Sequence, residues 1–567
     1  MPQRTPHYPG ACRQTGIYMV PEGKKGMKFV QGRQRVVEDY PDYLKDESNV
    51  QGDNASGIFF PRSIENIVYA VNCSRKEKMP LTVSGGRTGI CAGAVPEGGY
   101  VLSLEKMKRV LGLENRYGNW EVQVEAGVRL SELAEKLRSK DLGLKGEAAR
   151  QFKKDKNSYF YPPDPTEITA AVGGTAATNA SGARSFYYGP TREYVVGLEV
   201  VLSTGEVLRI RRGEVKEQDG YLKINKQKGS PLWIKVPGYR MPGTKNSAGL
   251  YAKKSMDLID LFIGSEGILG IIASVTLKLL KEPGLIIAGA GFFSDEKHAV
   301  DFVCRARGDR AVEGLQHRGT SSHPSVLSSR SREGKLRPMA LEYFDSGSLE
   351  VLEQERRAQG PTSEIPALPS FGGAVYFESE AETEHRMKEC LREWKTMIHA
   401  SGGDSSTSWC AVNKRDQQRL KAVRHALPES INRTIAEKKK LDGRIHKVGT
   451  DTAVPDRHLV QIMRFYRELL EKERFRYVIF GHIGDNHLHV NMIPSTYREL
   501  ERAKQIYTQI AARSVNLGGT VSAEHGVGKL KKEYLALQYS GSRLDEMRKV
   551  KQALDPSGLL NPGRVIE

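Results

Sequence analysis

Cysteines are few and scattered in this sequence. The 567 residues contain no CxxC pair, and the six cysteines are Cys12, Cys73, Cys91, Cys304, Cys390 and Cys410. A thiolate zinc site or an iron–sulfur cluster needs cysteines in close pairs, and disulfide frameworks belong mainly to short secreted chains. Any redox chemistry must therefore come from an organic cofactor or from a metal held by histidine and carboxylate side chains, with electrons leaving to an external partner.

Long apolar runs are also missing. A membrane span needs roughly 18 apolar residues, and the best candidates, Gly284–Phe293 and Tyr194–Leu202, are much shorter. The N-terminus has no apolar segment of the kind found in secretory signals. No GxxxxGK[ST] motif occurs, which argues against a P-loop NTPase. We therefore expect a cytoplasmic protein without a transmembrane segment, with peripheral attachment to a membrane as the alternative.

The chain is basic, because 86 Lys and Arg residues exceed 68 Asp and Glu residues and leave a net charge of +18. A protein that binds single-stranded nucleic acid would place aromatic side chains along a basic stripe. The densest basic tract, Lys438–Lys440, has no aromatic neighbour, and aromatic residues make up only 8% of the chain. We expect no nucleic-acid partner, and attribute the charge to steering of an anionic substrate or acidic redox partner, or to a solvated surface.

The length predicts more than one domain, since a domain takes roughly 100–200 residues. Residues 1–55 are polar, basic and rich in turns, and predict an N-terminal arm. Residues 56–282 alternate short strands with glycine clusters, whereas residues 283–553 carry longer amphipathic helices, so we expect two α+β domains. Segment 209–254 is rich in Lys and Gly and predicts a surface insertion, and segment 317–332 predicts a loop. The expected helices cover residues 63–76, 130–140, 381–399, 415–437, 457–473 and 496–516, and the expected strands residues 81–83, 101–104, 121–125, 198–202, 271–279, 373–378 and 477–480.

Three glycine-rich clusters mark the first of these domains. The first, Gly85–Gly89, follows a predicted strand, so its backbone N–H groups can wrap an anion such as a pyrophosphate; a plain tight turn is the alternative. The second covers residues 172–182 and the third residues 261–272. Small residues at this density let the backbone approach a flat, charged ligand closely. Thr178 and Asn179 can add hydrogen bonds to its ring edges or phosphates.

These motifs, in this order, resemble the FAD-binding domain of the vanillyl-alcohol oxidase (PCMH) superfamily. More narrowly, they resemble the D-lactate dehydrogenase, glycolate oxidase and D-2-hydroxyglutarate dehydrogenase group, from about Ile58 to the C-terminus. The resemblance implies a PCMH-type FAD domain of two subdomains at 56–282, a cap domain at 283–553 with an antiparallel sheet flanked by helices, and a return to the flavin domain at 554–567. It implies FAD contacts from Ser84, Gly85, Gly86, Arg87, Thr88, Gly89, Asp164, Gly173, Gly174, Thr178, Asn179, Gly182, Glu266, Gly267, Ile271 and Asn561.

A second set of motifs is rich in histidine. His482, His487 and His489 fall within eight residues, and alternation along the predicted strand places His487, His489 and Asn491 on one face with apolar residues on the other. That polar face must meet a cavity, the partner domain or water. An exposed edge strand is the alternative interpretation.

A further motif, Glu524-His525, lies between glycines in a loop and suits a site better than packing. Two imidazoles and one carboxylate are a ligand pattern for zinc or a similar divalent metal. The resemblance supports this hypothesis: it implies that His482, His489 and Glu524 bind a divalent ion, zinc or manganese. It also implies that His525 accepts a proton and that Asn491 contacts the substrate.

Two cations complete the implied site. Arg424 and Lys447 best match the residues that hold the substrate carboxylate in the group, a task for which arginine is well suited; the alternative is a pair of solvated surface cations. One departure stands out, because the group commonly has Gly-Asn where this chain has Asn486-His487. His487 could add a metal ligand, displace His489, or hydrogen-bond behind the site.

The predicted function is FAD-dependent oxidation of a 2-hydroxy acid (D-lactate, glycolate or a D-2-hydroxyglutarate-like acid) to the 2-oxo acid. The metal assists deprotonation of the hydroxyl by His525, and a hydride passes to flavin N5. The external electron acceptor is expected to be a quinone, a cytochrome, an electron-transfer flavoprotein or oxygen, and a homodimer is the default assembly. The alternative, a noncatalytic flavin-binding subunit of a larger electron-transfer complex, predicts an incomplete set of metal and base residues, whereas the set is complete.

Overall fold

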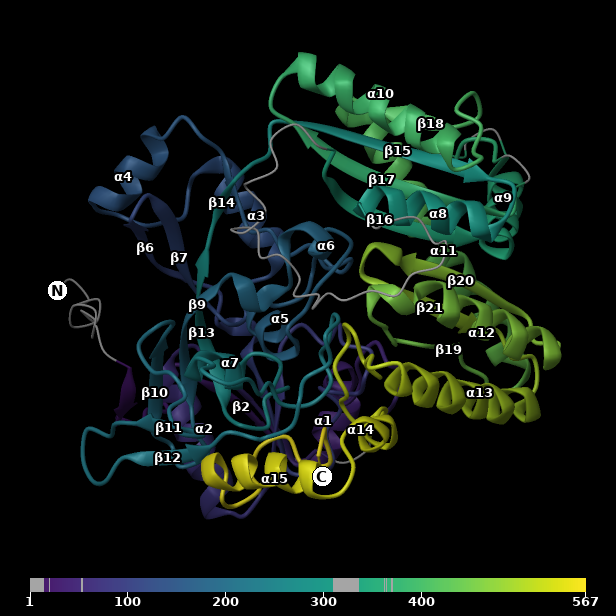
Figure 1. Cartoon of the computed structure of the whole chain (residues 1–567). Helices are drawn as coiled ribbons and strands as arrows, with labels where there is room; N and C mark the ends of the chain where they lie inside the picture. The colour runs from purple at the N-terminus through teal and green to yellow at the C-terminus, as the bar shows by residue number, and fades with distance from the viewer. Residues whose placement is uncertain are drawn as a thin grey trace.

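The computed structural model describes residues 15–566, apart from residues 20, 53–54, 309–335, 361–362, 364 and 369–370. The loop predicted at 317–332 lies outside the described residues. Within them the chain forms sheets of four, six and seven strands and two two-stranded ribbons (Figure 1). Helices accompany every large sheet, which confirms the α+β class.

The four-stranded sheet carries the first glycine loop. In spatial order its strands are β2 (Lys28–Gln31), β3 (Gly57–Phe60), β5 (Tyr100–Ser103) and β4 (Leu81–Ser84). Strands β3 and β4 both run parallel to β5, so helix α2 (Ile64–Lys76) connects them as a crossover. Helix α2 begins after Ser63, whose side chain accepts a hydrogen bond from the Asn66 N–H. Ser84 and the loop that follows it therefore lie at the carboxyl end of a buried parallel strand.

The six-stranded sheet is antiparallel and carries the second and third glycine clusters. Its strands, in spatial order, are β1 (Gly16–Tyr18), β10 (Val207–Arg211), β9 (Val195–Val201), β13 (Ile271–Lys278), β7 (Asn119–Glu125) and β6 (Val110–Arg116). Helices α3 (Leu130–Ser139) and α5 (Val172–Thr178) pack on it. A Cβ atom at Gly173 would lie 2.5 Å from the Cβ atom of Ala126, so this glycine allows α5 to approach the end of β7.

The N-terminal arm predicted at 1–55 is wrong for much of that segment. Strand β1 pairs with β10, and strand β2 pairs with β3. Helix α1 (Arg33–Asp39) packs on β2 and β3 and on the helical turn Pro41–Leu44 that follows it. The apolar residues Val30, Val36 and Leu44 are buried with Ile58. The segment is polar on average because β1 and β2 are edge strands. Its few buried apolar residues are too far apart in the sequence to predict a strand.

The seven-stranded sheet positions the histidine motif. Its strands, in spatial order, are β18 (Trp409–Ala411), β15 (Leu285–Phe293), β17 (Gly373–Ala381), β16 (Pro338–Asp345), β20 (Tyr477–His482), β21 (His487–Met492) and β19 (Val448–Gly449). The helices around it are α8 (Glu296–Arg307), α9 (Ser346–Gln359), α10 (Glu384–Ala400), α11 (Lys414–Leu441), α12 (Leu459–Lys472) and α13 (Tyr497–Asn516). In Figure 1 the colour of this sheet runs from teal at β15 to yellow-green at β20 and β21.

The chain ends beside the sheets where it began. Helices α14 (Lys532–Gln538) and α15 (Ser542–Leu554), drawn in yellow in Figure 1, lead back to the first half. The Leu81 N–H donates to the Leu559 carbonyl at 2.8 Å, and the Asn561 N–H donates to the Leu81 carbonyl at 3.0 Å. The last residues therefore run alongside β4. The remaining elements are α4 (Glu147–Lys154), α6 (Ser185–Tyr188), α7 (Leu258–Phe262), and the strand pairs β8 (Tyr159–Phe160) with β14 (Leu280–Lys281) and β11 (Tyr221–Ile224) with β12 (Leu232–Lys235).

Candidate active site at the histidine cluster

The hairpin of β20 and β21 brings three histidines together. His482 ends β20, His487 begins β21 and pairs with His482 in register, and His489 follows two residues later. The tight turn between the strands requires Asn486 to adopt a left-handed conformation, with φ of 53°, which asparagine tolerates better than most residues. The hairpin therefore brings the three imidazoles close together.

A carboxylate from a distant loop completes the cluster. The ligand atoms of His482, His487, His489 and Glu524 all lie within 4.8 Å of one another. Glu524 Oε2 is 3.1 Å from His482 Nε2 and 3.7 Å from His487 Nδ1. Three imidazoles and a carboxylate converging in a buried space have the chemistry of a divalent metal site.

The outer nitrogens of two imidazoles are held by protein acceptors. His482 Nδ1 lies 2.6 Å from Glu342 Oε1, on strand β16, and His489 Nδ1 lies 2.9 Å from the carbonyl oxygen of Thr450. A carbonyl oxygen can only accept, so His489 carries its hydrogen on Nδ1 and presents the Nε2 lone pair to the cluster. Such partners fix the tautomer and the orientation of metal-binding histidines.

Burial and the neighbouring charges set the protonation states. Burial alone would lower the pKa of His482, but Glu342 and Glu524 raise it to about 9. Burial lowers the pKa of His487 to about 4 and holds the pKa of His489 well below its usual value. Two of the imidazoles are therefore neutral near pH 7, the form that binds metals, and a metal ion must displace the proton of His482.

His525 lies beside the cluster rather than in it. Its ring stacks on the ring of His489, with centroids 5.6 Å apart, and its side chain is 29% exposed. The buried carboxylate of Asp451 accepts a hydrogen bond from the His525 backbone N–H at 3.1 Å and lies 3.4 Å from Nδ1. This arrangement leaves Nε2 as the nitrogen available for a proton from a ligand next to the cluster.

The loop that carries Glu524 and His525 is held by the first half of the chain. Glu266, in the third glycine cluster, accepts hydrogen bonds from the Val527 N–H at 2.7 Å and the Gly528 N–H at 2.8 Å. A Cβ atom at Gly528 would lie 1.9 Å from the Cys91 carbonyl oxygen, so no larger residue fits there. The predicted third cluster therefore contacts the loop of the predicted base directly.

Lys245 is a site residue that the sequence interpretation missed. Its Nζ lies 3.6 Å from Glu524 Oε2 and 3.9 Å from Asp485 Oδ2, and its side chain is 7% exposed. Burial raises the pKa of Glu524, but Lys245 and His482 together hold it well below the usual value. The segment 209–254 was expected to be a surface insertion, and this expectation is wrong at its end, where Ser247 donates to the Ser522 carbonyl at 2.8 Å. The many Lys and Gly residues of this segment predict exposure, although residues 247–250 are buried.

The two cations expected to hold a substrate carboxylate are both partly buried. Burial lowers the pKa of Arg424, on helix α11, but Glu342 and Tyr376 raise it overall, so the guanidinium stays charged. Lys447 precedes β19, and burial lowers its pKa. Strand β19 pairs with β21, and Gly449 lies opposite Asn491. Asn491, the expected substrate contact, donates to the His489 carbonyl at 3.2 Å. Lys447 therefore lies next to the strand that carries Asn491, whereas Arg424 comes from a helix. Their roles stay predictions.

The residues expected to contact FAD come together from three parts of the chain. Asn561 Oδ1 accepts from the Val83 N–H at 2.8 Å, and its Nδ2 donates to the Glu266 carbonyl at 2.8 Å. Asn561 thus ties the strand before the first glycine loop to the third cluster. In the second cluster, a Cβ atom at Gly182 would lie 1.7 Å from the Asp164 carbonyl oxygen, so Asp164 lies directly against this cluster.

Several of these residues fit a large anionic cofactor. Among the described residues, the buried hydroxyls of Ser84 and Ser181 have no hydrogen-bond partner, and Nη1 of Arg87 makes no hydrogen bond but lies 3.7 Å from Glu105 Oε2. Gly89 and Gly174 have no atom within 4 Å of where a Cβ would stand. Unpaired buried donors next to open backbone are what phosphate oxygens require, since buried polar groups are otherwise satisfied. Thr178, by contrast, donates to the Gly174 carbonyl at 3.0 Å.

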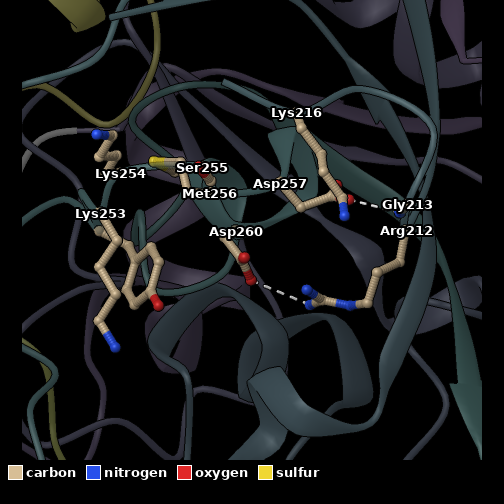
Figure 2. Close-up of a pocket in the computed structure, with 10 residues that line it drawn as sticks. Arg212, Gly213, Lys216, Lys253, Lys254, Ser255, Met256, Asp257 and Asp260 are labelled. Carbon is tan, nitrogen blue, oxygen red and sulfur yellow. Dashed lines mark hydrogen bonds and ion pairs between the residues drawn. The ribbon is translucent and has the colours of Figure 1, made fainter. Parts of the chain in front are cut away.

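A cavity of about 400 Å³ lies elsewhere, beside helix α7. Figure 2 shows Arg212 reaching Asp260 across it, with Lys216 and Lys253 on its walls. Asp260 Oδ1 lies 3.0 Å from Arg212 and 3.1 Å from Arg192, so these three charges pair with one another. The cavity shares no residue with the histidine cluster, where the ionisable groups converge.

Two family models match the chain in the order of these two halves. The model described as "FAD binding domain" matches residues 55–153 and 143–211, and the model described as "FAD linked oxidases, C-terminal domain" matches residues 326–565. A D-lactate dehydrogenase of Anaerostipes hadrus is 28% identical, covering 92% of each chain. The glycolate oxidase subunit GlcD of Bacillus subtilis is 26% identical, covering 90% of this chain and 88% of that one. A D-2-hydroxyglutarate dehydrogenase of Stutzerimonas stutzeri is 26% identical, covering 92% of this chain and 93% of that one.

Solved structures show the same fold at lower identity. The 4-ethylphenol oxidase from Gulosibacter chungangensis, in an isoeugenol complex, aligns over 95% of this chain and 94% of that one, with a TM-score of 0.58 and 17% identity. An alkyldihydroxyacetonephosphate synthase aligns over 96% of this chain and 87% of that one, with a TM-score of 0.56 and 16% identity.

Fold, family models and relatives define an FAD-dependent oxidoreductase that acts on a CH–OH donor. The chain belongs to the FAD-linked oxidases of the vanillyl-alcohol oxidase (PCMH) superfamily, in the group that contains the D-lactate and D-2-hydroxyglutarate dehydrogenases and the glycolate oxidase subunit. The predicted family and the predicted flavin are thereby confirmed. Among the described residues, no helix combines the length and the apolar character needed to cross a membrane.

Proposed function

We propose that the protein oxidises a 2-hydroxy acid to the 2-oxo acid at the histidine cluster, with a divalent metal and FAD as cofactors. The observation that carries this proposal is the convergence of His482, His489 and Glu524, with His525 stacked beside His489 and the third glycine cluster of the flavin half in contact with the same loop. The relatives' names support the substrate class.

The chain's residues divide the work as follows. His482, His489 and Glu524 would hold the metal, which when bound lowers the pKa of the substrate hydroxyl. His525 takes the hydroxyl proton on Nε2, and Asp451 keeps its ring in place through the backbone N–H and Nδ1.

The substrate's charge is met by cations from the chain. Arg424 and Lys447 would bind the substrate carboxylate, and Asn491 would contact it from the adjacent strand. Bound FAD supplies the acceptor for the two electrons and the α-hydrogen, and the residues named for it in the three glycine clusters would hold it. An external acceptor (a quinone, a cytochrome, an electron-transfer flavoprotein or oxygen) would then reoxidise the protein.

Anaerobic stopped-flow absorbance near 450 nm, with a panel of D- and L-2-hydroxy acids, tests the proposal. We expect one enantiomer of one acid to bleach the flavin, EDTA to abolish the bleaching, and zinc or manganese to restore it. A yellow protein that no hydroxy acid reduces, with or without metal, would favour the noncatalytic subunit instead. Bleaching that survives complete removal of the metal would overturn the role of the metal while keeping the reaction.

A further inference from the structure

The imidazole of His487 lies between two carboxylates and has no exposed surface. Its Nε2 is 2.8 Å from Asp451 Oδ1, and its Nδ1 points toward Glu524 Oε2 at 3.7 Å. Neither contact has the geometry of a hydrogen bond, so among the described residues both ring nitrogens of His487 lack a hydrogen-bond partner. Native proteins rarely bury polar nitrogens without partners, so this imidazole requires an explanation.

The carboxylate behind His487 is firmly held. Asp451 accepts hydrogen bonds from Ser522 Oγ at 2.8 Å and from the His525 N–H at 3.1 Å, and it forms an ion pair with Lys531 at 2.5 Å. All three of these groups contact Oδ2, so Oδ1 is the atom that faces His487 Nε2, at 2.8 Å. Nε2 is therefore turned toward Asp451, and Nδ1 is the nitrogen turned toward the other ligand atoms.

The same arrangement recurs at the other two imidazoles. His482 and His489 each hold Nδ1 against an acceptor behind the ring, whereas His487 has Nε2 beside Asp451 and Nδ1 3.7 Å from Glu524 Oε2. The nitrogen that faces the cluster is Nδ1 in His487, which lies at the first position of strand β21. A histidine that served only packing would need neither the carboxylate behind it nor a free nitrogen among ligand atoms.

We propose that His487 is a third histidine ligand of the metal, binding through Nδ1, so that the centre consists of His482, His487, His489 and Glu524. This inference rests on the metal site of the proposed function and adds to it a ligand and a positioning residue, Asp451. It also selects the metal. Imidazole nitrogen suits zinc better than manganese, which prefers oxygen ligands, so a site with three imidazoles favours zinc. Zinc can expand to five ligands, which leaves a position for a substrate oxygen.

The variant His487→Asn tests the ligand set in the full-length holoenzyme. Asparagine is the residue that the family commonly carries at this position, so the variant is expected to fold. Zinc K-edge X-ray absorption counts bound imidazoles without depending on activity. We expect three imidazoles in the wild type and two in His487→Asn, with zinc affinity in a chelator competition weaker by about ten- to a hundredfold, the range seen when support of a metal site is lost.

Selectivity provides a second readout. After dialysis against equal concentrations of zinc and manganese, the wild type should retain zinc, and His487→Asn should show a zinc-to-manganese ratio at least about tenfold lower. His385→Asn is the matched control, because His385 is exposed on α10, and it should match the wild type in every measurement. Asp451→Asn should weaken zinc binding while keeping three imidazoles.

The outcomes separate this inference from the function on which it rests. A zinc-loaded wild type with two imidazoles, or a His487→Asn variant with unchanged zinc affinity, would overturn the third ligand and leave the metal-dependent oxidation standing. A wild-type protein that binds no divalent metal under any loading condition would overturn both. A His487→Asn variant that loses one imidazole and its preference for zinc supports the proposal.

Discussion

The ammonium nitrogen of Lys245 lies 3.6 Å from Oε2 of Glu524, and both side chains are buried. The lysine comes from the turn before Gly249 in the first half of the chain, whereas the glutamate belongs to the loop after helix α13. The candidate site is therefore assembled across the two halves. A fixed positive charge next to a proposed metal ligand also means that lysine and metal compete for the same carboxylate.

We expect Lys245→Met to tighten the binding of a divalent metal by about tenfold. Two unit charges 4 Å apart interact by about 4 kcal/mol at an effective dielectric constant of 20, and residual screening reduces this repulsion. Lys245→Arg should behave as the wild type. Chelator competition with zinc at fixed pH measures the effect, with the exposed Lys254→Met of the same segment as the control. Weaker zinc binding in Lys245→Met would instead mean that the ammonium orients Glu524.

His525→Gln should lower kcat by about a hundred- to ten-thousandfold, the range that a positioned general base contributes. Flavin and metal contents should not change, because the His525 side chain is outside the group of four converging ligand atoms. Single-turnover reduction of the flavin measures the chemical step directly. His385→Gln, on an exposed histidine, is the control. A variant that reduces its flavin at the wild-type rate would show that another group takes the proton.

The sequence patterns predicted many of the helices and strands that carry the candidate site. Strands β20 and β21 match the alternation read around His482 and His489, and the helices predicted at 63–76, 130–140, 381–399, 415–437, 457–473 and 496–516 are present as α2, α3, α10, α11, α12 and α13. Local periodicity sufficed because each element has its own apolar face. The α+β class followed from the same patterns.

What the sequence could not predict depends on contacts between distant segments. Glu342 and Asp451 look like ordinary carboxylates in sequence, and only the neighbouring strands show that they hold His482 and His487. Lys245 lies in a stretch rich in Lys and Gly that predicts exposure, yet it is buried against the loop of Glu524. No local sequence pattern predicts which loop of one half will pack on a charged side chain of the other half.

An ion pair between the halves gives a pH prediction. Arg184, the residue before α6, lies 2.6 Å from Glu378 Oε2, on β17. Burial raises the pKa of Glu378, but Arg184 and Lys421 lower it overall from 4.5. A carboxyl with a lowered pKa in the folded state stabilises above its unfolded pKa, and this stability is lost as the pH falls through the folded value. Glu378→Gln should therefore unfold at lower temperature than the wild type above about pH 4.5, by about 3 kcal/mol of lost stability.

The difference between the two proteins should shrink as the pH falls below 4.5, because the wild-type carboxyl then becomes protonated and resembles the amide. Thermal unfolding followed by circular dichroism between pH 3 and 7 measures both midpoints. Glu389→Gln on the exposed face of α10 is the control, and it should follow the wild type closely. A gap between the midpoints that stays constant with pH would mean that the charge of Glu378 contributes nothing.

Asn561→Ala should loosen the flavin half without touching the histidine cluster. The side chain accepts from the Val83 N–H and donates to the Glu266 carbonyl, both at 2.8 Å, and each buried group left unpaired costs about 1–3 kcal/mol. Because Val83 precedes the first glycine loop and Glu266 lies in the third cluster, we expect weaker FAD binding, measured by fluorescence titration of the apoprotein. Asn119→Ala, on an exposed residue of β7, is the control. Zinc affinity should be nearly unchanged in Asn561→Ala, since Glu266 still holds the loop of Glu524 through its own carboxylate. Unchanged FAD affinity together with a loss of zinc would show that Asn561 acts on the metal loop instead of the flavin.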